Sequence, residues 1–397
     1  MSVRTAVILA AGEGTRLRPL TRNRPKPMLP AANRPILEHV LDSLIEAGME
    51  RLVLVVGYRR NRVQDHFGST YRGVDIDYVV QHKQLGSGHA LLQAADTVSG
   101  PLLVVNGDRL IESDSVSAVT TAFEEDTAAA AMAVMEHDNT SRYGVVSLNG
   151  TNVTEIVEKP DSDDFRLINA GIYAFDETVF ETIARTERDS GELALTDSIA
   201  RLVDGDQVRG VRIDGLWVDA TYPWDLLAVA STLLERGRTG TPAGEDGVWI
   251  DSEARVHDDA TIRPPVAVGA HCEIGPGAVV GPNVALAANT TVGANATIER
   301  SVVDADSRIG HASTLVDVVL GQDVHLGVGT VVTGGPADVR VGREIHEDQP
   351  LGAVLADRVR VAGNASFEPG TLVGPEATVG DGCHVTGNVS EGSEVVR

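Results

Sequence analysis

The stretch VGAHCEIGPGAVVGPNVAL, residues 268–286, places an aliphatic residue at every sixth position. The same spacing runs through nine positions from Ile250 to Ile298, slips in phase near residue 300, and continues to Val332. It resumes from Leu355 to Val385. A six-residue period suits neither a helix nor a hairpin, and it is typical of hexapeptide repeats that each bury one apolar side chain. The pattern predicts a parallel β-helix over residues 248–397.

Before these repeats, the chain alternates between strand-like and helix-like segments. Apolar runs at residues 6–10, 52–56, 76–80, 102–105 and 131–134 are separated by helical stretches such as 35–47 and 88–96. This alternation predicts an α/β domain with a mostly parallel sheet and helices on both faces. A Gly-, Thr- and Pro-containing stretch, 237–247, suits a linker. The predicted domains are therefore residues 1–236 and 248–397.

Composition narrows the class of protein. No apolar run approaches the roughly eighteen residues of a membrane span, and the start reads as a strand rather than a signal peptide, so we expect a cytoplasmic protein without a membrane partner. A net charge of −24 without a basic stripe argues against nucleic acid. Cys272 and Cys383 lack the spacing of a zinc site and are interpreted as small buried residues. Arginine largely replaces lysine, which favours a halophilic protein.

The first thirty residues carry a second pattern. The run VILAAGEGTRLRPLT, residues 7–21, leads from an apolar strand into a turn of small residues, and RPKPMLP follows at 24–30. Backbone N–H groups in such a turn can approach phosphate oxygens without an intervening Cβ, and Arg16 and Lys26 add positive charge. The third Gly of a dinucleotide fingerprint and the Gly-Lys-Ser/Thr of a Walker loop are both missing.

This string resembles the signature of the sugar-1-phosphate nucleotidylyltransferases. The resemblance implies a Rossmann-like nucleotidyltransferase domain and catalytic roles for Arg16 and Lys26. It also implies nucleotide contacts from the end of the strand and the turn, at Leu9, Ala10, Ala11, Gly12 and Gly14.

A further motif, QHKQLGSGHA at residues 81–90, follows a predicted strand and opens a helix. In the family that it resembles, the Gln and the Gly-x-Gly turn hold the nucleotide base and ribose. The amide of Gln81 would then read the base edge, with Gly86 and Ser87 beside it. The alternative is that Gly86 and Gly88 form an ordinary turn into a helix.

Two aspartates match the metal ligands of the resembling family. Asp108 ends the apolar strand in VVNGD, and Asp219 lies in WVDATYPWDL, residues 217–226. Mg²⁺ that bridges phosphates usually takes one or two protein carboxylates. The resemblance therefore implies a Mg²⁺ site at Asp108 and Asp219, although a strand-end Asp is often a turn residue. Asp225 is expected to cap the following helix or to pack against it.

The resemblance also implies a binding site for the sugar phosphate, formed by residues 143–146, 156–160 and 168–173. In the resembling enzymes, Gly144 would give a backbone amide to the sugar, Glu158 and Asn169 would bond its hydroxyls, and Lys159 would face the sugar phosphate. The alternative for Glu158 and Lys159 is a solvated charge pair.

Together these segments predict an enzyme that transfers a nucleotidyl group to a sugar-1-phosphate and releases pyrophosphate. UTP or dTTP and glucose-1-phosphate or N-acetylglucosamine-1-phosphate are the expected substrates. No general base is needed, because the attacking phosphate is already an anion. Two alternatives remain: a mannose-1-phosphate guanylyltransferase, which Arg18–Thr21 resembles, and a non-catalytic regulatory or scaffold subunit. Retention of Arg16, Lys26, Asp108 and Asp219 favours the enzyme.

The resemblance to the archaeal bifunctional nucleotidylyltransferase/acetyltransferase group, which is similar to N-acetylglucosamine-1-phosphate uridyltransferases, covers nearly the full length. It implies a left-handed β-helix and a homo-oligomer, a trimer through that helix. It also raises a second activity, N-acetylation of an amino-sugar-1-phosphate with acetyl-CoA as co-substrate. His311 matches the catalytic base, but Thr314 and Gly334 stand where Tyr and Asn are expected, and no lysine follows position 159. The alternative is a domain that only oligomerises.

Overall fold

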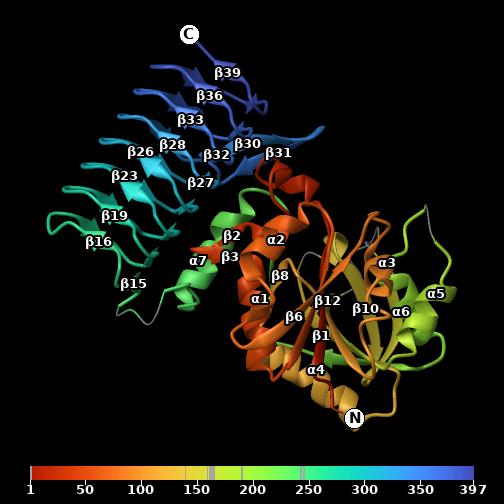
Figure 1. Ribbon diagram of the computed structural model, residues 1–397. Helices are drawn as coiled ribbons and strands as arrows, with labels where there is room; N and C mark the ends of the chain where they lie inside the picture. The colour runs from red at the N-terminus through yellow and green to blue at the C-terminus, as the bar shows by residue number, and fades with distance from the viewer. Residues whose placement is uncertain are drawn as a thin grey trace. The chain divides into compact units, whose positions relative to one another are not determined.

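A computed structural model describes residues 2–138, 140–158, 160, 166–188, 191–241, 244 and 246–397. The chain forms two compact units, each discontinuous in sequence (Figure 1). The sheet unit comprises Met1–Glu13 and Leu37–Val218, and the β-helix unit comprises Gly14–Ile36 and Asp219–Arg397. Residues 14–36, which contain most of the first motif, thus belong to the same unit as the hexapeptide repeats. These units are discontinuous in sequence, so they do not test the predicted continuous domains, residues 1–236 and 248–397, or the predicted linker, 237–247. Those bounds stay a prediction.

The sheet unit is built on a ten-stranded sheet of order β10-β11-β13-β9-β12-β7-β1-β4-β6-β5. Helix α4 packs against β9, β12 and β13, and α6 packs against β11 and β13. The strands of the sheet are β1 (Thr5–Ala10), β4 (Arg51–Val56), β5 (Thr70–Tyr71), β6 (Val74–Val80), β7 (Leu102–Asn106), β9 (Ala130–Glu136), β10 (Gly144–Asn149), β11 (Asn152–Glu158), β12 (Leu167–Phe175) and β13 (Val208–Arg212). The helices are α1 (Ile36–Glu46), α2 (Arg60–Phe67), α3 (Ser87–Leu92), α4 (Ser113–Glu125), α5 (Val179–Arg185) and α6 (Leu195–Val203). A short 3-10 turn, η4 (Thr140–Arg142), and two short strands, β8 (Arg109–Leu110) and β14 (Val218–Asp219), accompany them. Ile36 of α1 and Asp219 of β14 belong to the β-helix unit.

Four adjacent strands, β7, β1, β4 and β6, run parallel, as the sequence predicted. Because carboxyl ends of parallel strands meet at one edge, this arrangement brings the turns after β1, β6 and β7 to the same edge. The other half of the sheet is mixed, since β12 runs antiparallel to both β7 and β9. Helix α3 ends at Leu92, earlier than the expected residue 96.

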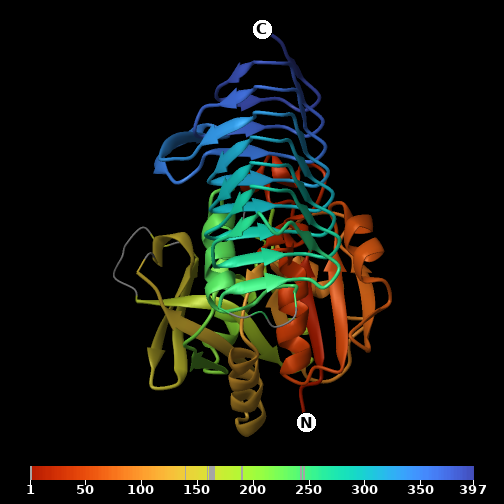
Figure 2. The same ribbon diagram turned by 90° about the vertical axis from the view of Figure 1, so that its left-hand side faces the viewer.

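The β-helix unit confirms the parallel β-helix predicted from the repeats. Short strands stack into three parallel sheets, and Figure 2 shows the successive coils. Val248 pairs with Val266 and Val266 with Val284, so these partners are 18 residues, or three hexapeptides, apart. Val284 pairs with Ser301, only 17 residues on, which is the structural form of the phase slip near residue 300.

The first sheet of the β-helix contains β15 (Val248–Ile250), β18 (Val266–Val268), β21 (Val284–Leu286), β24 (Ser301–Val303), β27 (Val318–Leu320), β32 (Ala353–Leu355), β35 (Thr371–Val373) and β38 (Asn388–Val389). The second contains β16 (Arg255–Val256), β19 (Glu273–Ile274), β22 (Thr291–Val292), β25 (Arg308–Ile309), β28 (His325–Leu326), β33 (Arg360–Val361), β36 (Thr378–Val379) and β39 (Glu394–Val395). The third contains β17 (Thr261–Ile262), β20 (Val279–Val280), β23 (Thr297–Glu299), β26 (Thr314–Val316), β29 (Val331–Thr333), β34 (Ser366–Phe367) and β37 (His384–Val385).

An antiparallel hairpin explains the gap in the repeats between Val332 and Leu355. Its strands are β30 (Ala337–Val341) and β31 (Glu344–Gln349), and it projects from the stack of coils (Figure 2). The stack itself is not interrupted, because β27 pairs directly with β32 across the insertion. The hairpin is therefore an addition to one corner of the β-helix.

The remaining elements of this unit are the segments that carry the first motif and the residues after 218. They are the 3-10 turns η1 (Thr15–Leu17), η2 (Leu20–Arg22) and η3 (Lys26–Met28), the short strands β2 (Pro30–Ala31) and β3 (Arg34–Pro35), and helix α7 (Asp225–Glu235). Helix α7 packs against β2, β21, β24 and β27. The apolar face of this helix thus joins the residues 14–36 to the first sheet of the β-helix.

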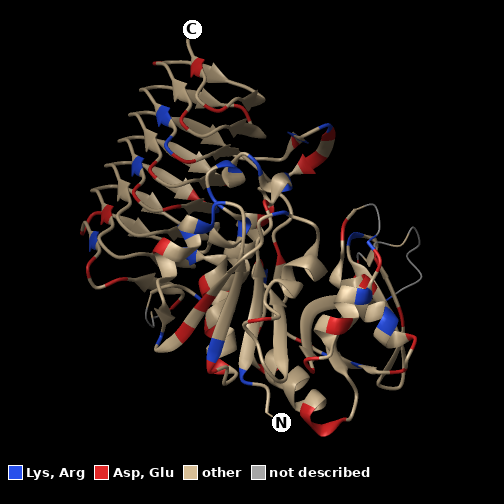
Figure 3. Cartoon of the chain, turned by 45° about the vertical axis from the view of Figure 1, so that its right-hand side comes forward, with Lys and Arg blue, Asp and Glu red and all other residues tan. Residues whose placement is uncertain are grey.

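Burial agrees with the interpretation of the repeats and the cysteines. The repeat positions from Val268 to Val385 line one continuous apolar core, which also contains Cys272 and Cys383 as free, buried thiols. Burial raises the pKa of the Cys272 thiol, as expected for a structural cysteine. No helix among the described residues is long and apolar enough to cross a membrane. Figure 3 colours the positions of Lys and Arg and of Asp and Glu along the backbone, and both signs of charge occur in both units.

Candidate functional site

The turn after β1 leaves its backbone open. Ala10 and Ala11 are buried, whereas a Cβ added at Gly12 would meet no atom within 4 Å. Packing within the described chain therefore does not require glycine at position 12. Because Gly12 has no side chain, the backbone of the turn stays accessible. A bound phosphate needs such access to backbone N–H groups.

Gly14 is required for a different reason. It has a φ of 63°, and a Cβ there would lie 2.8 Å from Lys26 Cβ. Its carbonyl accepts a hydrogen bond from Thr21 Oγ1 at 2.8 Å. Gly14, Thr21 and Lys26 are thus packed together, and the two parts of the first motif form one folded segment.

One electrostatic feature of this segment is the ion pair between Lys26 and Asp219. Lys26 Nζ lies 2.6 Å from Asp219 Oδ1, and the two side chains are only 12% and 9% exposed. The other oxygen, Oδ2, accepts a hydrogen bond from Thr221 Oγ1 at 3.3 Å. The β-helix unit therefore joins a predicted catalytic cation to a predicted metal ligand that is 193 residues away in sequence.

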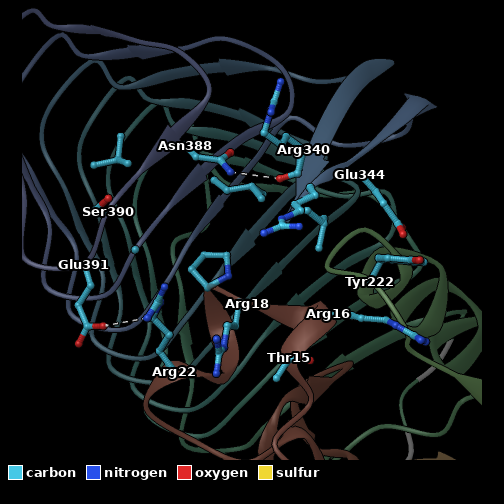
Figure 4. Close-up of a pocket in the computed structure, with 17 residues that line it drawn as sticks. Thr15, Arg16, Arg18, Arg22, Tyr222, Arg340, Glu344, Asn388, Ser390 and Glu391 are labelled. Atoms are coloured by element: carbon cyan, nitrogen blue, oxygen red, sulfur yellow. Dashed lines mark hydrogen bonds and ion pairs between the residues drawn. The ribbon is translucent and has the colours of Figure 1, made fainter.

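Arg16 is exposed and lines a cavity of about 580 Å³ in the β-helix unit (Figure 4). Four more arginines line the same cavity: Arg18, Arg22, Arg340 and Arg343. Arg22 pairs with Glu391 at 3.6 Å, and Asn388 Nδ2 donates to the Arg340 carbonyl at 3.1 Å. Glu344 and Glu391 also line the cavity, so its five arginines leave an excess of positive charge, although the chain has a net charge of −24.

The second motif is held by interactions within the sheet unit. Gln81 is buried, and its Nε2 donates to the Gly86 carbonyl at 3.1 Å and lies 2.9 Å from His89 Nδ1. Burial, and then Arg188, lower the pKa of His89, so the neutral ring can accept this hydrogen bond. The amide nitrogen of Gln81 is thus engaged by the turn, and its reading of a base stays a prediction.

Packing explains the glycines of this motif. Gly86 has a φ of 98°, and a Cβ there would overlap the Leu193 carbonyl, while a Cβ at Gly88 would lie 3.0 Å from the same oxygen. Ser87 Oγ accepts a hydrogen bond from the Leu195 backbone N–H at 2.9 Å. The structure therefore supports the turn interpretation of both glycines, and it leaves the nucleotide contacts of Gly86 and Ser87 untested.

A residue that the sequence analysis did not single out connects the two nucleotide motifs. Gln84 Nε2 donates to the Ala11 carbonyl at 3.0 Å, across 73 residues of sequence. The turns after β1 and β6 are thus tied together within the sheet unit. Gln84 lies inside the second motif, but nothing in its local sequence points to Ala11.

The two predicted metal ligands lie in different units. Asp108 follows β7 in a turn and is half-buried in the sheet unit, whereas Asp219 belongs to the β-helix unit. Among the described residues, no group of three or more His, Cys, Asp or Glu side chains could hold a metal ion. Two carboxylates nevertheless fit Mg²⁺ chemistry, because this ion keeps waters or takes phosphate oxygens for its other ligands.

The predicted sugar-side residues come from three neighbouring strands of the sheet unit. Gly144 on β10 pairs with Glu158 on β11, and a Cβ at Gly144 would lie 2.9 Å from Glu158 Oε2. Asn169 on β12 is buried; its Nδ2 donates to Tyr173 Oη at 2.7 Å, and its Oδ1 accepts from the Gly171 N–H at 3.0 Å. Burial raises the pKa of Tyr173 to about 12. Lys159 lies outside the described residues.

An aromatic cluster lies beside these strands and was not part of the predicted site. Tyr143 and Trp217 make an edge contact with ring centroids 5.1 Å apart, and the Arg109 guanidinium lies 5.2 Å from the Trp217 ring centroid. Trp217 Nε1 donates to the Ala170 carbonyl at 2.8 Å, one residue after Asn169. Arg109 directly follows Asp108, a predicted metal ligand. This position was the only sequence feature that could have pointed to Arg109 as a site residue.

His311 lies on an exposed turn of the β-helix. Its Nδ1 accepts a hydrogen bond from the Ala294 N–H at 2.8 Å. In the neutral ring the proton then resides on Nε2, which makes that nitrogen a donor rather than a base. The predicted role of His311 in acetyl transfer remains untested, and this geometry does not favour it.

Comparisons with known proteins agree with these features. Residues 5–236 match the family model described as Nucleotidyl transferase, and residues 245–349 match the GMPPB C-terminal domain. The chain is 34% identical over 413 residues to "Bifunctional protein GlmU" of Methanococcus vannielii, covering 99% of this chain and 97% of that protein.

Two shorter similarities concern the nucleotidyltransferase part. The "UTP--glucose-1-phosphate uridylyltransferase AglF" of Haloferax volcanii is 38% identical over 225 residues, which are 55% of this chain and 92% of that protein. A crystal structure of UDP-glucose pyrophosphorylase complexed with UDP-glucose superposes with a TM-score of 0.55. It covers 59% of this chain and 99% of that chain at 22% identity, so it supports the fold alone.

Proposed function

Since this chain belongs to the nucleotidyl transferase family and is a sugar-1-phosphate nucleotidyltransferase, we propose that it makes a pyrimidine nucleotide sugar. UTP or dTTP would supply the nucleotidyl group, and glucose-1-phosphate or N-acetylglucosamine-1-phosphate would accept it. The similarity to the glucose-1-phosphate uridylyltransferase of Haloferax volcanii supports this choice of substrates.

The observation that carries the proposal is the Lys26–Asp219 pair on the folded segment that begins at Gly14. A phosphate oxygen of the sugar-1-phosphate attacks the α-phosphorus of the triphosphate, and the bond from that phosphorus to pyrophosphate breaks. Negative charge increases on the leaving pyrophosphate. Lys26 and Arg16 would stabilise that charge as fixed cations, and no proton transfer is required.

Mg²⁺ is part of this proposal. Asp108 and Asp219 would hold it with their carboxylate oxygens, and the ion would supply positive charge to the phosphates when bound. Lys26 is the counter-ion of Asp219 in the structure. Asp225 is set apart from these ligands, because its Oδ2 accepts hydrogen bonds from the Thr221 and Tyr222 N–H groups at 2.8 and 2.7 Å.

The other predicted contacts complete the proposed site. The backbone of the β1 turn would hold the triphosphate, and Gln81, Gly86 and Ser87 would hold the base and ribose. Gly144, Glu158, Lys159 and Asn169 would hold the sugar phosphate. Nδ2 and Oδ1 of Asn169 each have one partner within the sheet unit, so its contribution would use the second amide N–H or the second oxygen lone pair.

Two further proposals concern the β-helix and its setting. We propose that it assembles the chain as a homotrimer in a salt-rich cytoplasm, which light scattering of the purified protein in molar KCl would test. N-acetylation with acetyl-CoA is a second candidate activity, supported by the full-length similarity to a protein named bifunctional. Transfer of an acetyl group to glucosamine-1-phosphate that survives in His311→Ala would exclude His311 as its base.

The decisive experiment measures pyrophosphate release in molar KCl with Mg²⁺. UTP, dTTP, GTP, CTP and ATP are each paired with glucose-, N-acetylglucosamine- and mannose-1-phosphate. We expect one pyrimidine pairing to turn over in the wild type, to lose about 10²- to 10³-fold in Asp108→Asn, and to be unchanged in the exposed control Asp258→Asn.

Other outcomes would redirect the assignment. Turnover with GTP and mannose-1-phosphate would favour a mannose-1-phosphate guanylyltransferase. No turnover with any pairing, from folded and oligomeric protein, would favour a non-catalytic regulatory or scaffold subunit. Equal rates in Asp108→Asn and the wild type would contradict the proposed metal site.

A further inference from the structure

The segment that carries Lys26 is attached to the β-helix through a buried arginine. Arg24 forms ion pairs with Asp304, through Nη1, and with Asp357, through Nη2. The three side chains are 8%, 13% and 2% exposed, respectively. One guanidinium thus bridges two carboxylates that water hardly reaches.

Both carboxylates lie just after strands of the first sheet of the β-helix. Asp304 directly follows β24, and Asp357 follows β32 by two residues; β27 lies between these strands in the sheet. Asp304 Oδ1 accepts the Ala305 N–H at 2.8 Å, and Asp357 Oδ1 accepts the Gln322 N–H at 3.0 Å. The backbone therefore fixes the direction of each acceptor before Arg24 is considered.

The charge of Arg24 is well supported at this position. Burial disfavours the charged form, but Asp304 and Asp357 outweigh it and raise the pKa of Arg24 above its usual range. A planar guanidinium can address two carboxylates in fixed directions, which an ammonium group cannot. The pairing therefore restricts the orientation of the backbone at Arg24 as well as its distance from the β-helix.

This restriction reaches Lys26 within two residues. Arg24 Nη1 also approaches the Met28 carbonyl at 3.5 Å, at the end of the turn Lys26–Met28. The turn is closed by the Met28 N–H to the Pro25 carbonyl and the Leu29 N–H to the Lys26 carbonyl, both at 3.0 Å. Lys26 therefore lies in a turn whose two ends are fixed by backbone hydrogen bonds.

The partner of Lys26 is attached to the same unit by a separate contact. Tyr222 and Trp224, which follow Asp219, stack with ring centroids 4.8 Å apart. His346 of the hairpin strand β31 lies 4.4 Å from the Tyr222 ring and 5.2 Å from the Trp224 ring. Lys26 and Asp219 are thus each linked to the β-helix by separate contacts of neighbouring residues.

We propose that Arg24 is a positioning residue, which through Asp304 and Asp357 makes the β-helix fix Lys26 for nucleotidyl transfer. This inference rests on the proposed function for its effect on rate. It assigns the hexapeptide repeats a part in the first reaction, in addition to any role in assembly or acetyl transfer.

The kinetic test uses full-length variants in which the cluster is neutral. Arg24→Met alone would leave two buried carboxylates without a counter-charge and could unfold the protein. The triple variant Arg24→Met/Asp304→Asn/Asp357→Asn removes all three charges, so no buried charge is left without a counter-charge. The matched control is Arg300→Met/Asp317→Asn, which removes another Arg–Asp pair of the β-helix, at 2.7 Å.

We expect the triple variant to lose about 10- to 100-fold in kcat, because misplacing a charged group by about 1 Å has effects of this size. The KM for the sugar-1-phosphate should change less than about twofold, and Arg24→Lys should recover part of kcat. A purely structural role would reduce the folded fraction but leave kcat per folded molecule unchanged. The control pair should keep wild-type kcat.

A second readout does not depend on turnover. The chain has three lysines, so amine acylation followed by mass spectrometry can compare Lys26 with the exposed Lys83 in one molecule. In the wild type Lys26 should react slowly, because Asp219 and burial protect Nζ. In the folded triple variant we expect its rate, relative to Lys83, to rise at least about fivefold.

The two readouts separate the possible failures. Wild-type kcat together with an unchanged Lys26-to-Lys83 ratio in the folded triple variant would overturn the role of Arg24. If the wild type releases no pyrophosphate with any substrate pairing, the proposed function fails by itself, and the labelling ratio still decides whether Arg24 positions Lys26.

Discussion

Two glycine-containing turns follow parallel strands of one sheet, yet different forces shape them. At the first turn, residues 10–14, Gly12 faces open space, and the following segment presents charged groups. At the second, residues 81–88, Gly86 is packed against Leu193 and Gln81 bonds the turn itself. The first glycines of the two Gly-x-Gly patterns therefore differ in origin: access explains Gly12, whereas close packing explains Gly86.

The largest expected effect concerns Lys26, in the charged segment that follows the first turn. Lys26→Ala should reduce kcat by about 10²- to 10³-fold, because one fixed cation near the developing pyrophosphate charge is lost. Lys83→Ala, in the second motif, is the matched control and should keep wild-type kcat. Steady-state pyrophosphate release measures both, and similar losses in the two variants would remove the contrast between the turns.

Gly86→Ala tests whether close packing shapes the second turn. The added methyl would overlap the Leu193 carbonyl at a φ of 98°, so we expect a loss of about 2–4 kcal/mol in the free energy of unfolding. Denaturant unfolding followed by circular dichroism measures this loss. An unchanged midpoint would mean that the Leu193 segment does not constrain this turn.

Gly12→Ala should act on ligand binding instead. Since a Cβ there meets no atom within 4 Å, the free energy of unfolding should change by less than about 1 kcal/mol. The KM for the triphosphate should rise about tenfold, equivalent to one lost phosphate hydrogen bond. A stability loss as large as that of Gly86→Ala would show that packing, not access, explains both glycines.

The smallest effect is expected at Gln81. Gln81→Met removes the hydrogen bond to the Gly86 carbonyl and the contact with His89, which should lower the free energy of unfolding by about 1 kcal/mol. If Gln81 also reads the base, the preference for the favoured triphosphate over the others should fall by about fivefold. Competition assays with mixed triphosphates measure this preference, and an unchanged preference would assign Gln81 to the turn alone.

The sequence predicted regular features of the fold better than inserted or paired ones. Six-residue spacing is a local property, so it located the β-helix coils from Ile274 to Val385. The hairpin β30–β31 left only a gap in that spacing, because its exposed strands carry no repeat of their own. The mixed half of the sheet was also missed, since the pairing of β12 with both β7 and β9 depends on contacts distant in sequence.

At the site, sequence motifs predicted residue types but not their partners. Lys26 and Asp219 were each proposed from a motif, whereas their ion pair required the fold. Nothing local distinguishes Asp304 and Asp357 from the other carboxylates of a chain with net charge −24, so the pairing of Arg24 was not predictable. The Gly86–Leu193 contact was also missed, because every residue has a backbone carbonyl and the sequence does not indicate which one lies near Gly86.

The hairpin β30–β31 has a practical consequence for protein engineering. The coil beneath it closes by direct pairing of β27 with β32, and its tip at Gly342 has a φ of 62° with open space around a Cβ. A peptide epitope or small fluorescent reporter grafted at Gly342 should be accommodated without altering the register of the solenoid. Such a graft would lie on the hairpin that carries His346, which contacts Tyr222 and Trp224.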